Sequence, residues 1–327
     1  MSYRSRTFAA LCAALASASL LAACGSGSSS SGGENGKPAT LNVGVIPIAD
    51  VAPLYVGIKQ GFFKKEKLTI KPKIADGGPA IVSATVSGDD QIGFSNTTSL
   101  IIASSKNLPL QIVTQGVLGA KKATPDEAWD AVLVKKGSPI KSPKDLEGKT
   151  IAVNSLNNVG PLTINTAMKN AGADYKKVKY LELPFPDANA ALQAGRVDAA
   201  WVVEPFVTQG LVQGSKPILY PFEQTAPSLT VANYFVTKQY ASQNKDVVDR
   251  FTRAMNKSLV YSQGHADAVR KAVLTYTKIP PAGAQHMKLP QWKADLNRPT
   301  IEKTADLAKE YGYIKKKPNL DDLIRQP

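Results

Sequence analysis

The stretch "LQAGRVDAAWVVEPF", Leu192–Phe206, decides the fold of this chain. Its first residues close a helical segment at Gly195, because glycine readily takes the left-handed backbone conformation that ends helices. The uncharged run "AAWVV" (199–203) then reads as a buried strand, which stops at Glu204 and Pro205. A helix that passes directly into a buried strand predicts one unit of an alternating α/β fold.

The same alternation extends outward through most of the chain. Helical segments separate the expected strands, which are 41–46, 68–74, 91–96 and 110–117 in the first half and 150–155, 178–185 and 198–206 in the second. This alternation is typical of parallel sheets that helices cover on both faces. We therefore expect an α/β fold.

The two halves of the pattern read alike. Pro53-Leu54 and Pro161-Leu162 follow the first strand of each half, and Gly88 and Gly195 come later at nearly equal distances. This is either a true internal correspondence or convergence between two ordinary strand–helix–strand units. Both alternatives predict two similar α/β lobes.

The lobes are expected to be joined twice. The extended stretch 131–136 leads into the second lobe, and 231–238 leads back. The first lobe is then residues 40–130 and 231–327, and the second is 131–230. Helical segments expected to pack on the first lobe are 247–261, 266–276 and 300–311.

The N-terminal segment predicts export. Arg4 and Arg6 precede an uncharged stretch of small and apolar residues, which is typical of a signal peptide over residues 1–23. The "LAAC" that ends at Cys24 resembles a bacterial lipobox, in which the cysteine becomes lipidated; the alternative is a generic cleavage site with a chance cysteine. Residues 24–39 are rich in Ser and Gly, so they predict a flexible tether.

The chain is basic, with 40 Lys and Arg against 26 Asp and Glu and a net charge of +14. Binding to nucleic acid or to another anionic polymer is one interpretation of this charge. The lysines, however, lie in scattered short pairs that are not interleaved with stacking aromatic residues. We therefore expect a solvated basic surface and no nucleic-acid partner.

Catalytic signatures are missing from the sequence. His265 and His286 are its two histidines, and both lie in the C-terminal helical region, away from the expected strand ends. The sequence contains no HExxH, CxxC or P-loop motif. We expect no catalytic residue, no metal site and no cofactor.

The expected strand ends supply the candidate binding residues, because open α/β sheets bind ligands beyond the carboxyl ends of their strands. These ends are short, polar or glycine-rich. Several of the polar residues are also ordinary helix caps, and both roles can hold together. The candidates are Ile48, Asp50, Val51, Gly78, Ser95, Asn96, Thr97 and Gln115 in the first lobe and Ser155, Asn157, Asn158, Phe185 and Glu204 in the second.

The two candidate acids bear on the chemistry of the ligand. Glu204 either accepts a hydrogen bond from the ligand or lies at the positive end of the helix that follows it, and Asp50 poses the same choice. If both faced the ligand, a simple anion would be repelled. No arginine lies at an expected strand end. Phe185 and Phe206 could offer an aromatic face, whereas Trp201 is expected in the core.

Five segments resemble a known family: "GVIPIADVAPLYVGIKQGFFKKEKL", "VSGDDQIGFSN", "SPIKSPKDLEGKTIAVNS", "LQAGRVDAAWVVEPF" and "YGYIKKKPNLDDLI". They are similar to the solute-binding proteins of ABC importers in the nitrate/sulfonate/taurine and thiamine-pyrimidine-precursor group, which is NMT1/SsuA-like. The resemblance implies a two-lobed type II periplasmic-binding-protein fold with hinge crossings. Such a protein closes on one small molecule, catalyses nothing and docks on a permease that has a cytoplasmic ATPase.

The resemblance also implies the kind of ligand and the location. The ligand is expected to be a small organic nutrient, either a sulfonate or taurine-like compound or a pyrimidine or other polar heterocycle. The protein is expected to be a monomer, held on the outer face of the cytoplasmic membrane by lipid on Cys24. Two other classes stay open: a surface lipoprotein that binds an anionic polymer, and an enzyme on the same fold.

Overall fold

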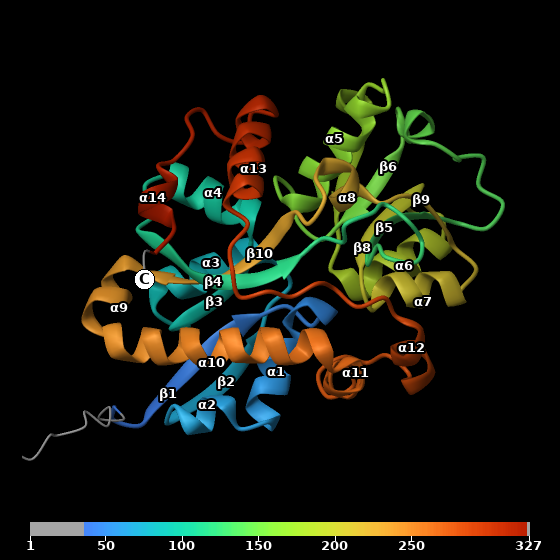
Figure 1. Ribbon diagram of the computed structural model, residues 1–327. Helices are drawn as coiled ribbons and strands as arrows, with labels where there is room; N and C mark the ends of the chain where they lie inside the picture. The colour runs from blue at the N-terminus through green and yellow to red at the C-terminus, as the bar shows by residue number, and fades with distance from the viewer. Residues whose placement is uncertain (1–35, 326–327) are drawn as a thin grey trace, which may run out of the picture. The chain divides into compact units, whose positions relative to one another are not determined.

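Two five-stranded sheets organise residues 36–325, the part of the chain that this computed structural model describes (Figure 1). The predicted signal peptide, Cys24 and most of the expected tether lie outside these residues. The first sheet has the order β2-β1-β3-β10-β4, with strands Ala39–Val45 (β1), Leu68–Ile74 (β2), Ile92–Asn96 (β3), Leu110–Leu118 (β4) and Thr230–Thr237 (β10). The second has the order β7-β6-β8-β5-β9, with strands Asp130–Val134 (β5), Thr150–Val153 (β6), Lys179–Glu182 (β7), Ala199–Val203 (β8) and Lys216–Leu219 (β9). We call each sheet, with the helices packed on it, the first and the second lobe.

Each sheet contains one antiparallel strand, so the expectation of purely parallel sheets is wrong at two positions. Strand β10 runs against β3 and β4, and β5 runs against β8 and β9. These are the first strands after the chain changes lobe. The chain leaves one lobe at the carboxyl ends of its strands and enters the other at the same edge, which forces the entering strand to run backward.

The connections between the lobes therefore differ from the predicted ones. The stretches 131–136 and 231–238, expected to join the lobes, instead form most of β5 and β10. The chain crosses between the sheets in residues 119–129 and again in residues 226–229. A buried strand and an extended connection have the same apolar pattern, which is why the sequence did not separate them.

Both sheets share one topology, as the similar halves predicted. In each, the first three parallel strands of the lobe pair in the order second, first, third, and the antiparallel strand and the last parallel strand lie beside the third. Gly88 and Gly195, which follow corresponding helices, have φ values of 90° and 70°, a region that favours glycine.

Helices cover the sheets and form the C-terminal part of the chain. Their bounds are Ala52–Lys59 (α1), Phe62–Lys65 (α2), Gly78–Ser87 (α3), Thr97–Ser105 (α4), Val159–Asn170 (α5), Phe185–Gln193 (α6), Phe206–Val212 (α7), Pro221–Thr225 (α8), Lys238–Gln243 (α9), Lys245–Gly264 (α10), Ala266–Val273 (α11), Pro281–His286 (α12), Arg298–Glu310 (α13) and Leu320–Leu323 (α14). Helices α10 and α11 pack on α1 of the first lobe, as expected. In addition, α12 contacts α7 and α13 contacts α5, so the C-terminal part also touches the second lobe.

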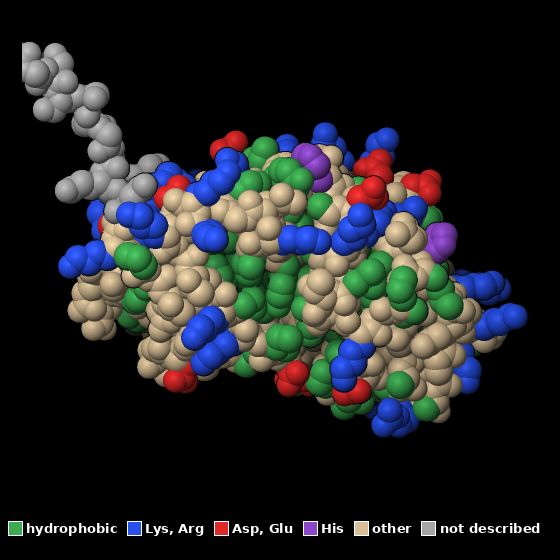
Figure 2. Space-filling model, turned by 90° about the horizontal axis from the view of Figure 1, so that it is seen from below, with side chains coloured by type: hydrophobic (Ala, Val, Ile, Leu, Met, Phe, Trp, Pro, Cys, Tyr) green, Lys and Arg blue, Asp and Glu red, His purple; other side chains and the backbone are tan. Residues whose placement is uncertain are grey.

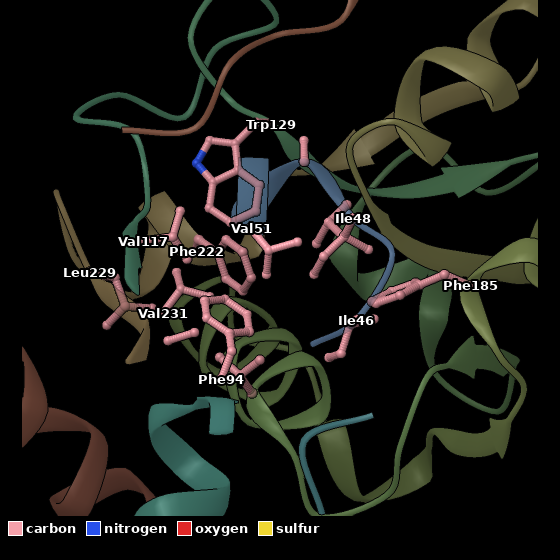
Figure 3. Packing of buried hydrophobic residues seen from close by; sticks show 14 of the residues in the cluster. Ile46, Ile48, Val51, Phe94, Val117, Trp129, Phe185, Phe222, Leu229 and Val231 are labelled. Carbon is pink, nitrogen blue, oxygen red and sulfur yellow. The ribbon is translucent and has the colours of Figure 1, made fainter. Parts of the chain in front are cut away.

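One continuous cluster of buried apolar residues runs through both lobes. Figure 3 shows its centre, where Trp129 of the first crossing and Phe222 of α8 lie among Val51, Val117 and Val231. The indole Nε1 of Trp129 donates a hydrogen bond to the carbonyl oxygen of Leu118 at 3.1 Å. The lobes are therefore in apolar contact in this state.

A pair of buried acids lies where the two crossings meet the second lobe. Asp130 begins β5, Glu223 lies in α8, and their carboxyl groups face each other. Burial and the neighbouring Glu223 hold the pKa of Asp130 well above its usual range, and burial raises the pKa of Glu223 to about 7. The backbone N–H of Ala120, in the first crossing, donates to Glu223 Oε1 at 2.8 Å. The pair thus joins a crossing to the lobe that it enters.

Arg250 of α10 holds the beginning of the described chain. Its guanidinium donates to the carbonyl oxygen of Lys37 at 3.0 Å, to that of Glu66 at 2.6 Å and to the carboxylate of Asp246 at 2.9 Å. The Arg250 side chain is 3% exposed. Three acceptors therefore compensate the burial of this charge.

The surface carries its positive charge in a dispersed form. Figure 2 shows Lys and Arg side chains scattered over one face, with no single basic patch. Among residues 36–325, no helix is long and apolar enough to cross a membrane.

Candidate functional site

A small cavity of about 30 Å³ lies between the strand ends of the two sheets. From the first lobe it is lined by Ile46, Ile48, Asp50, Phe94, Asn96, Val231 and Ala232, and from the second by Asn154, Asn158, Val159, Phe185, Trp201, Val203 and Phe222. This is the position that the strand-end rule predicts. The volume leaves room for only about two water molecules, so a larger molecule can enter only if the lobes move apart.

The lobes touch around this cavity. The backbone N–H of Ala49 donates to the carbonyl oxygen of Glu204 at 2.9 Å across the lobes. A Cβ placed on Gly77 of the first lobe would lie 2.5 Å from the Oγ of Ser155 of the second. A side chain at position 77 would require Ser155 to shift, so the lobes approach closely here and the structure is that of a closed form.

The turn that carries Asp50 is held by residues from the C-terminal part of the chain. The hydroxyl of Tyr276 donates to the carbonyl oxygen of Ile48 at 2.9 Å, and the indole Nε1 of Trp292 donates to that of Asp50 at 3.1 Å. These bonds fix the backbone from which the Asp50 side chain extends at the cavity wall.

The carboxyl group of Asp50 itself lacks a complete set of partners. Asp50 is 3% exposed, and its Oδ1 atom has no hydrogen-bond partner. Burial raises the pKa of Asp50 to about 8. The side chains of Tyr234 and Tyr276 lie near it, and burial raises the pKa of both, so both are uncharged near neutral pH. The cavity wall thus contains a carboxyl group with unused hydrogen-bonding capacity.

The second lobe supplies an aromatic wall. The ring centroids of Phe185 and Trp201 are 5.5 Å apart, and those of Trp201 and Phe222 are 5.7 Å apart. The indole Nε1 of Trp201 donates to Asp130 Oδ2 at 3.0 Å, which fixes the ring. Trp201 is therefore both a core residue, as expected, and part of the cavity wall. In Figure 3, Phe185 faces Ile46 and Ile48 of the first lobe.

Two of the three amide side chains on the wall, those of Asn96 and Asn158, serve as helix caps. Asn96 Oδ1 accepts from the N–H of Ser99 at 2.9 Å at the start of α4. Asn158 Oδ1 accepts from the N–H of Val159 at the start of α5. Each side chain therefore satisfies one of the free N–H groups at the start of its helix.

The candidates from the sequence divide into two groups. Those that line the cavity are Ile48, Asp50, Asn96, Asn158 and Phe185. Those that do not line it are Val51, Gly78, Ser95, Thr97, Gln115, Ser155, Asn157 and Glu204.

Most of the second group are buried beside the cavity and have structural contacts. Thr97 Oγ1 donates to the carbonyl oxygen of Thr230 at 2.6 Å, which ties α4 to β10. Gln115 Nε2 donates to the carbonyl oxygen of Val117 at 3.2 Å. Asn157 is exposed, with a φ of 48°, because it forms the tight turn before α5. Neighbours of a binding residue in sequence thus need not share its role.

Glu204 serves the fold rather than the cavity. Its Oε1 accepts from Thr208 Oγ1 at 2.8 Å and from the N–H of Lys288 at 2.9 Å, and its Oε2 accepts from the N–H of Thr208 at 3.0 Å. The side chain is buried, and burial raises its pKa to about 7. Of the two alternatives, the structure favours the local role near the start of α7.

One expectation about the histidines is wrong. His286 was expected far from the strand ends, but it lines a surface pocket together with Pro205 and Thr208, just beyond β8. His265 stacks on Tyr261 with ring centroids 3.7 Å apart. Neither lines the cavity. Among residues 36–325, no group of His, Cys, Asp and Glu could hold a metal ion.

The sequence missed most of the apolar wall. Phe222, Val231 and Ala232 reach the cavity because the second crossing and β10 return to the edge where the strands end. Their position depends on the antiparallel strand, which the alternating pattern did not reveal. Asn154 was missed by a single position, since the strand before it ends two residues earlier than expected.

Two sheets of one topology, with a cavity between their strand ends, define a two-lobed periplasmic-binding-protein fold. The structure superposes on the alkanesulfonate-binding protein SsuA from Xanthomonas axonopodis pv. citri with a TM-score of 0.75 and 18% sequence identity, covering 89% of this chain and 100% of that one. This similarity confirms the fold class.

Sequence comparison identifies the family. The family model described as "NMT1/THI5 like" matches residues 48–268, and the chain belongs to this family. The chain is 31% identical over 219 residues to the taurine-binding periplasmic protein of Escherichia coli (strain K12), covering 65% of this chain and 64% of the relative. It is 25% identical over 227 residues to the formylaminopyrimidine-binding protein of Halalkalibacterium halodurans, covering 68% and 65%. The match thus spans just under two thirds of these two relatives.

Proposed function

We propose that this chain is the solute-binding component of an ABC importer. It captures a small organic molecule in the cavity between its lobes, outside the cytoplasmic membrane, and delivers it to a permease with a cytoplasmic ATPase. The observation that carries this proposal is the buried cavity between two lobes, whose size requires opening for entry. The family and the names of its members support the same function.

Two moving bodies are part of this proposal. Residues 40–130 and 231–327 form one body, and residues 131–230 form the other. They rotate about the crossings at 119–129 and 226–229, as hinge closure requires. The protein works as a monomer, since one chain supplies both walls of the cavity.

The N-terminal part of the proposal concerns anchoring. Residues 1–23 direct export, and lipid on Cys24 holds the protein at the outer face of the cytoplasmic membrane. The sequence "LAAC" and the Ser/Gly-rich stretch that follows it support this. Mass spectrometry of the membrane-extracted protein tests it, because a diacylglyceryl group on Cys24 adds a defined mass that Cys24→Ser removes.

We propose that the protein binds its solute without converting it to a product. The relatives found by sequence are named as binding proteins, and neither histidine lies on the cavity wall. A bound solute is therefore expected to be recovered unchanged.

A thermal-shift screen of the purified chain tests the function. The panel holds taurine, alkanesulfonates, nitrate, aminopyrimidines and, for the polymer alternative, heparin. A true solute at 100 times its Kd raises the free energy of unfolding by about 2.7 kcal/mol, which raises Tm by several degrees. Salt-sensitive binding of heparin, with no response to any small molecule, would contradict the proposal and favour a polymer-binding surface lipoprotein.

A further inference from the structure

We infer that Asp130 and Glu223 share one proton when the lobes are closed, and that this proton links the two crossings to the cavity wall and makes closure dependent on pH. The pair lies where the chain passes between the lobes. Asp130 is the first residue after the first crossing, and Glu223 lies in α8, just before the second. This link rests on the proposed function and would regulate the same site.

Each of the two buried carboxyl groups has one oxygen with a donor and one without. Asp130 Oδ2 accepts from Trp201 Nε1 at 3.0 Å, and Glu223 Oε1 accepts from the N–H of Ala120 at 2.8 Å. Asp130 Oδ1 and Glu223 Oε2 are buried and have no hydrogen-bond partner. Because the carboxyl groups face each other, one proton between them would make one group the donor and the other its acceptor. Two ionised groups would repel each other.

The titratable neighbours of the pair favour this proton. Burial raises the pKa of Glu223 to about 7, and Glu127 of the first crossing, which is paired with the exposed Lys122 at 3.8 Å, raises it further. Tyr220, at the start of α8, faces both acids, and burial raises its pKa, so its hydroxyl is uncharged near neutral pH. Burial and Glu223 also hold the pKa of Asp130 well above its usual range. A second negative charge on the pair is therefore unfavourable.

The Glu223 side of the pair holds the two crossings together. The N–H of Gly119 donates to the carbonyl oxygen of Leu229 at 2.8 Å. In the other direction, the N–H of Ser228 donates to the carbonyl oxygen of Ala120 at 2.9 Å, so the crossings are paired with each other. Glu223 accepts from the N–H of the same Ala120. A change in the backbone of the crossings therefore acts directly on Glu223.

The Asp130 side of the pair holds a ring of the cavity wall. Trp201, which donates to Asp130, lines the cavity. Its ring also packs on that of Phe222, the neighbour of Glu223, with centroids 5.7 Å apart. A Cβ placed on Gly160 of α5 would lie 2.5 Å from the Trp201 ring, so the ring is confined from that side as well. The two carboxyl groups thus connect the surface on which a solute packs to the crossings.

Closure and protonation are linked with a definite sign. Opening changes the backbone of the crossing that bonds Glu223 and admits water to the pair, so both acids move toward their ordinary pKa values near 4 and release the shared proton. The closed form then holds one more proton than the open form near neutral pH. Closure is therefore favoured below about pH 7 and becomes less favourable as the pH rises above it.

NMR of the indole groups tests the shared proton. In ¹H–¹⁵N spectra of the purified chain, the Nε1–H signal of Trp201, identified by its loss in Trp201→Phe, should move with a midpoint near pH 7. In Glu223→Gln the signal should stay in place, because the amide donates to Asp130 at every pH while its oxygen still accepts from Ala120. A signal that moves alike in both proteins would overturn the shared proton.

Distances between two spin labels test the link to closure. The labels are attached to Ala80→Cys in α3 of the first lobe and Ala190→Cys in α6 of the second, both exposed positions, in a chain whose Cys12 and Cys24 are replaced by serine. Without added solute, the ratio of closed to open molecules should fall roughly tenfold between about pH 6 and pH 8, the effect of one proton.

Matched variants separate this pair from other buried acids. Asp130→Asn and Glu223→Gln each replace an acid with an amide that imitates its protonated form, so both should stay closed across this pH range. Glu223→Ala, which removes the acceptor for Ala120, should be more open than the wild type at pH 6. Asp90→Asn should match the wild type, since Asp90 is also a buried acid without a partner for its Oδ1 but does not line the cavity.

The possible failures are distinguishable from one another. A wild-type ratio that stays constant with pH, or one that falls equally in Asp130→Asn and Glu223→Gln, overturns the inference and leaves the proposed function standing. A single distance between the labels at every pH, also when each solute of the thermal-shift panel is added, overturns the inference together with the two moving bodies of the proposed function.

Discussion

At the scale of single residues, Asp50 and Glu204 show that two similar sequence signals can have opposite outcomes. Both acids follow a buried strand of an α/β unit. Glu204 finds three donors within the protein, whereas Asp50 Oδ1 finds none. The decisive donor, the N–H of Lys288, comes from a segment distant in sequence. The residues next to Glu204 in the sequence cannot reveal a contact with a residue so far along the chain.

The contacts of Glu204 lead to a stability prediction. Glu204→Gln places an amide N–H₂ group where the carboxylate now accepts from Thr208 or Lys288, so one buried donor loses its acceptor. We expect the free energy of unfolding to fall by roughly 1–3 kcal/mol, with the solute Kd of the folded protein unchanged within about twofold. Urea titration and calorimetry measure the two quantities.

An exposed acid provides the control for this substitution. Glu302 pairs with Arg298 on the surface, so Glu302→Gln should change the stability by less than about 1 kcal/mol. Unchanged stability together with weaker binding in Glu204→Gln would return Glu204 to the binding site.

At the scale of secondary-structure elements, much of the α/β alternation could be predicted from sequence. Strands β1–β4 and β6–β8 lie where the apolar runs placed them, since such runs are distinctive when glycine and polar residues bound them. Strands β5 and β10 were predicted as connections, and β9 was missed. Of the candidate site, the residues next to parallel strand ends were found, but the wall supplied by β10 and α8 was not. Those residues reach the cavity because of the way the strands are connected and paired, and the residue pattern of a single strand does not encode that arrangement.

The acids at the start of β5 and in α8 predict a pH dependence. The folded pKa of Glu223 is about 7, and that of Asp130 is also raised, both above unfolded values near 4. The folded state therefore holds more protons than the unfolded state between about pH 4 and 7. Stability from this pair is fully present below pH 4 and is lost as the pH rises through 7.

Asp130→Asn tests this dependence. The amide can accept from Trp201 Nε1 and donate to Glu223, which reproduces the protonated acid at every pH. Between pH 5 and pH 8 we expect the wild type to lose roughly 1–3 kcal/mol more stability than Asp130→Asn, the scale of a pKa shift of one to two units. Urea titrations at both pH values measure the difference, and equal losses in the two proteins would contradict it.

At the scale of the whole molecule, the closed arrangement of the lobes is the feature that matters most. The cavity is small, the apolar cluster is continuous across the lobes, and Gly77 meets Ser155 at close range. Solute exchange therefore requires separation of surfaces that are now in contact. This separation needs lobes that stay rigid and two crossings whose backbone can change conformation.

A disulfide between the lobes tests closure directly. Gly77→Cys with Ser155→Cys, in a chain whose own Cys12 and Cys24 are replaced by serine, places two thiols at bonding range. We expect the oxidised protein to bind no added solute and the reduced protein to bind normally. Stability should rise on oxidation by about 2–4 kcal/mol. Each single cysteine variant is the control, and solute binding by the oxidised double variant would show that the lobes need not separate.

The grip of Arg250 on Lys37 and Glu66 determines how a mechanical load would travel through the molecule. Any pull that arrives from the chain before Gly36 meets the hydrogen bond from Arg250 of α10 to the carbonyl oxygen of Lys37, and Arg250 is itself held by Glu66 and Asp246. That helix packs on α1, α2 and β4, all of them in the first lobe. The N-terminal segment is thus attached to the first lobe and to neither crossing, so a tether on the N-terminus would restrain the first lobe directly and the second only through it.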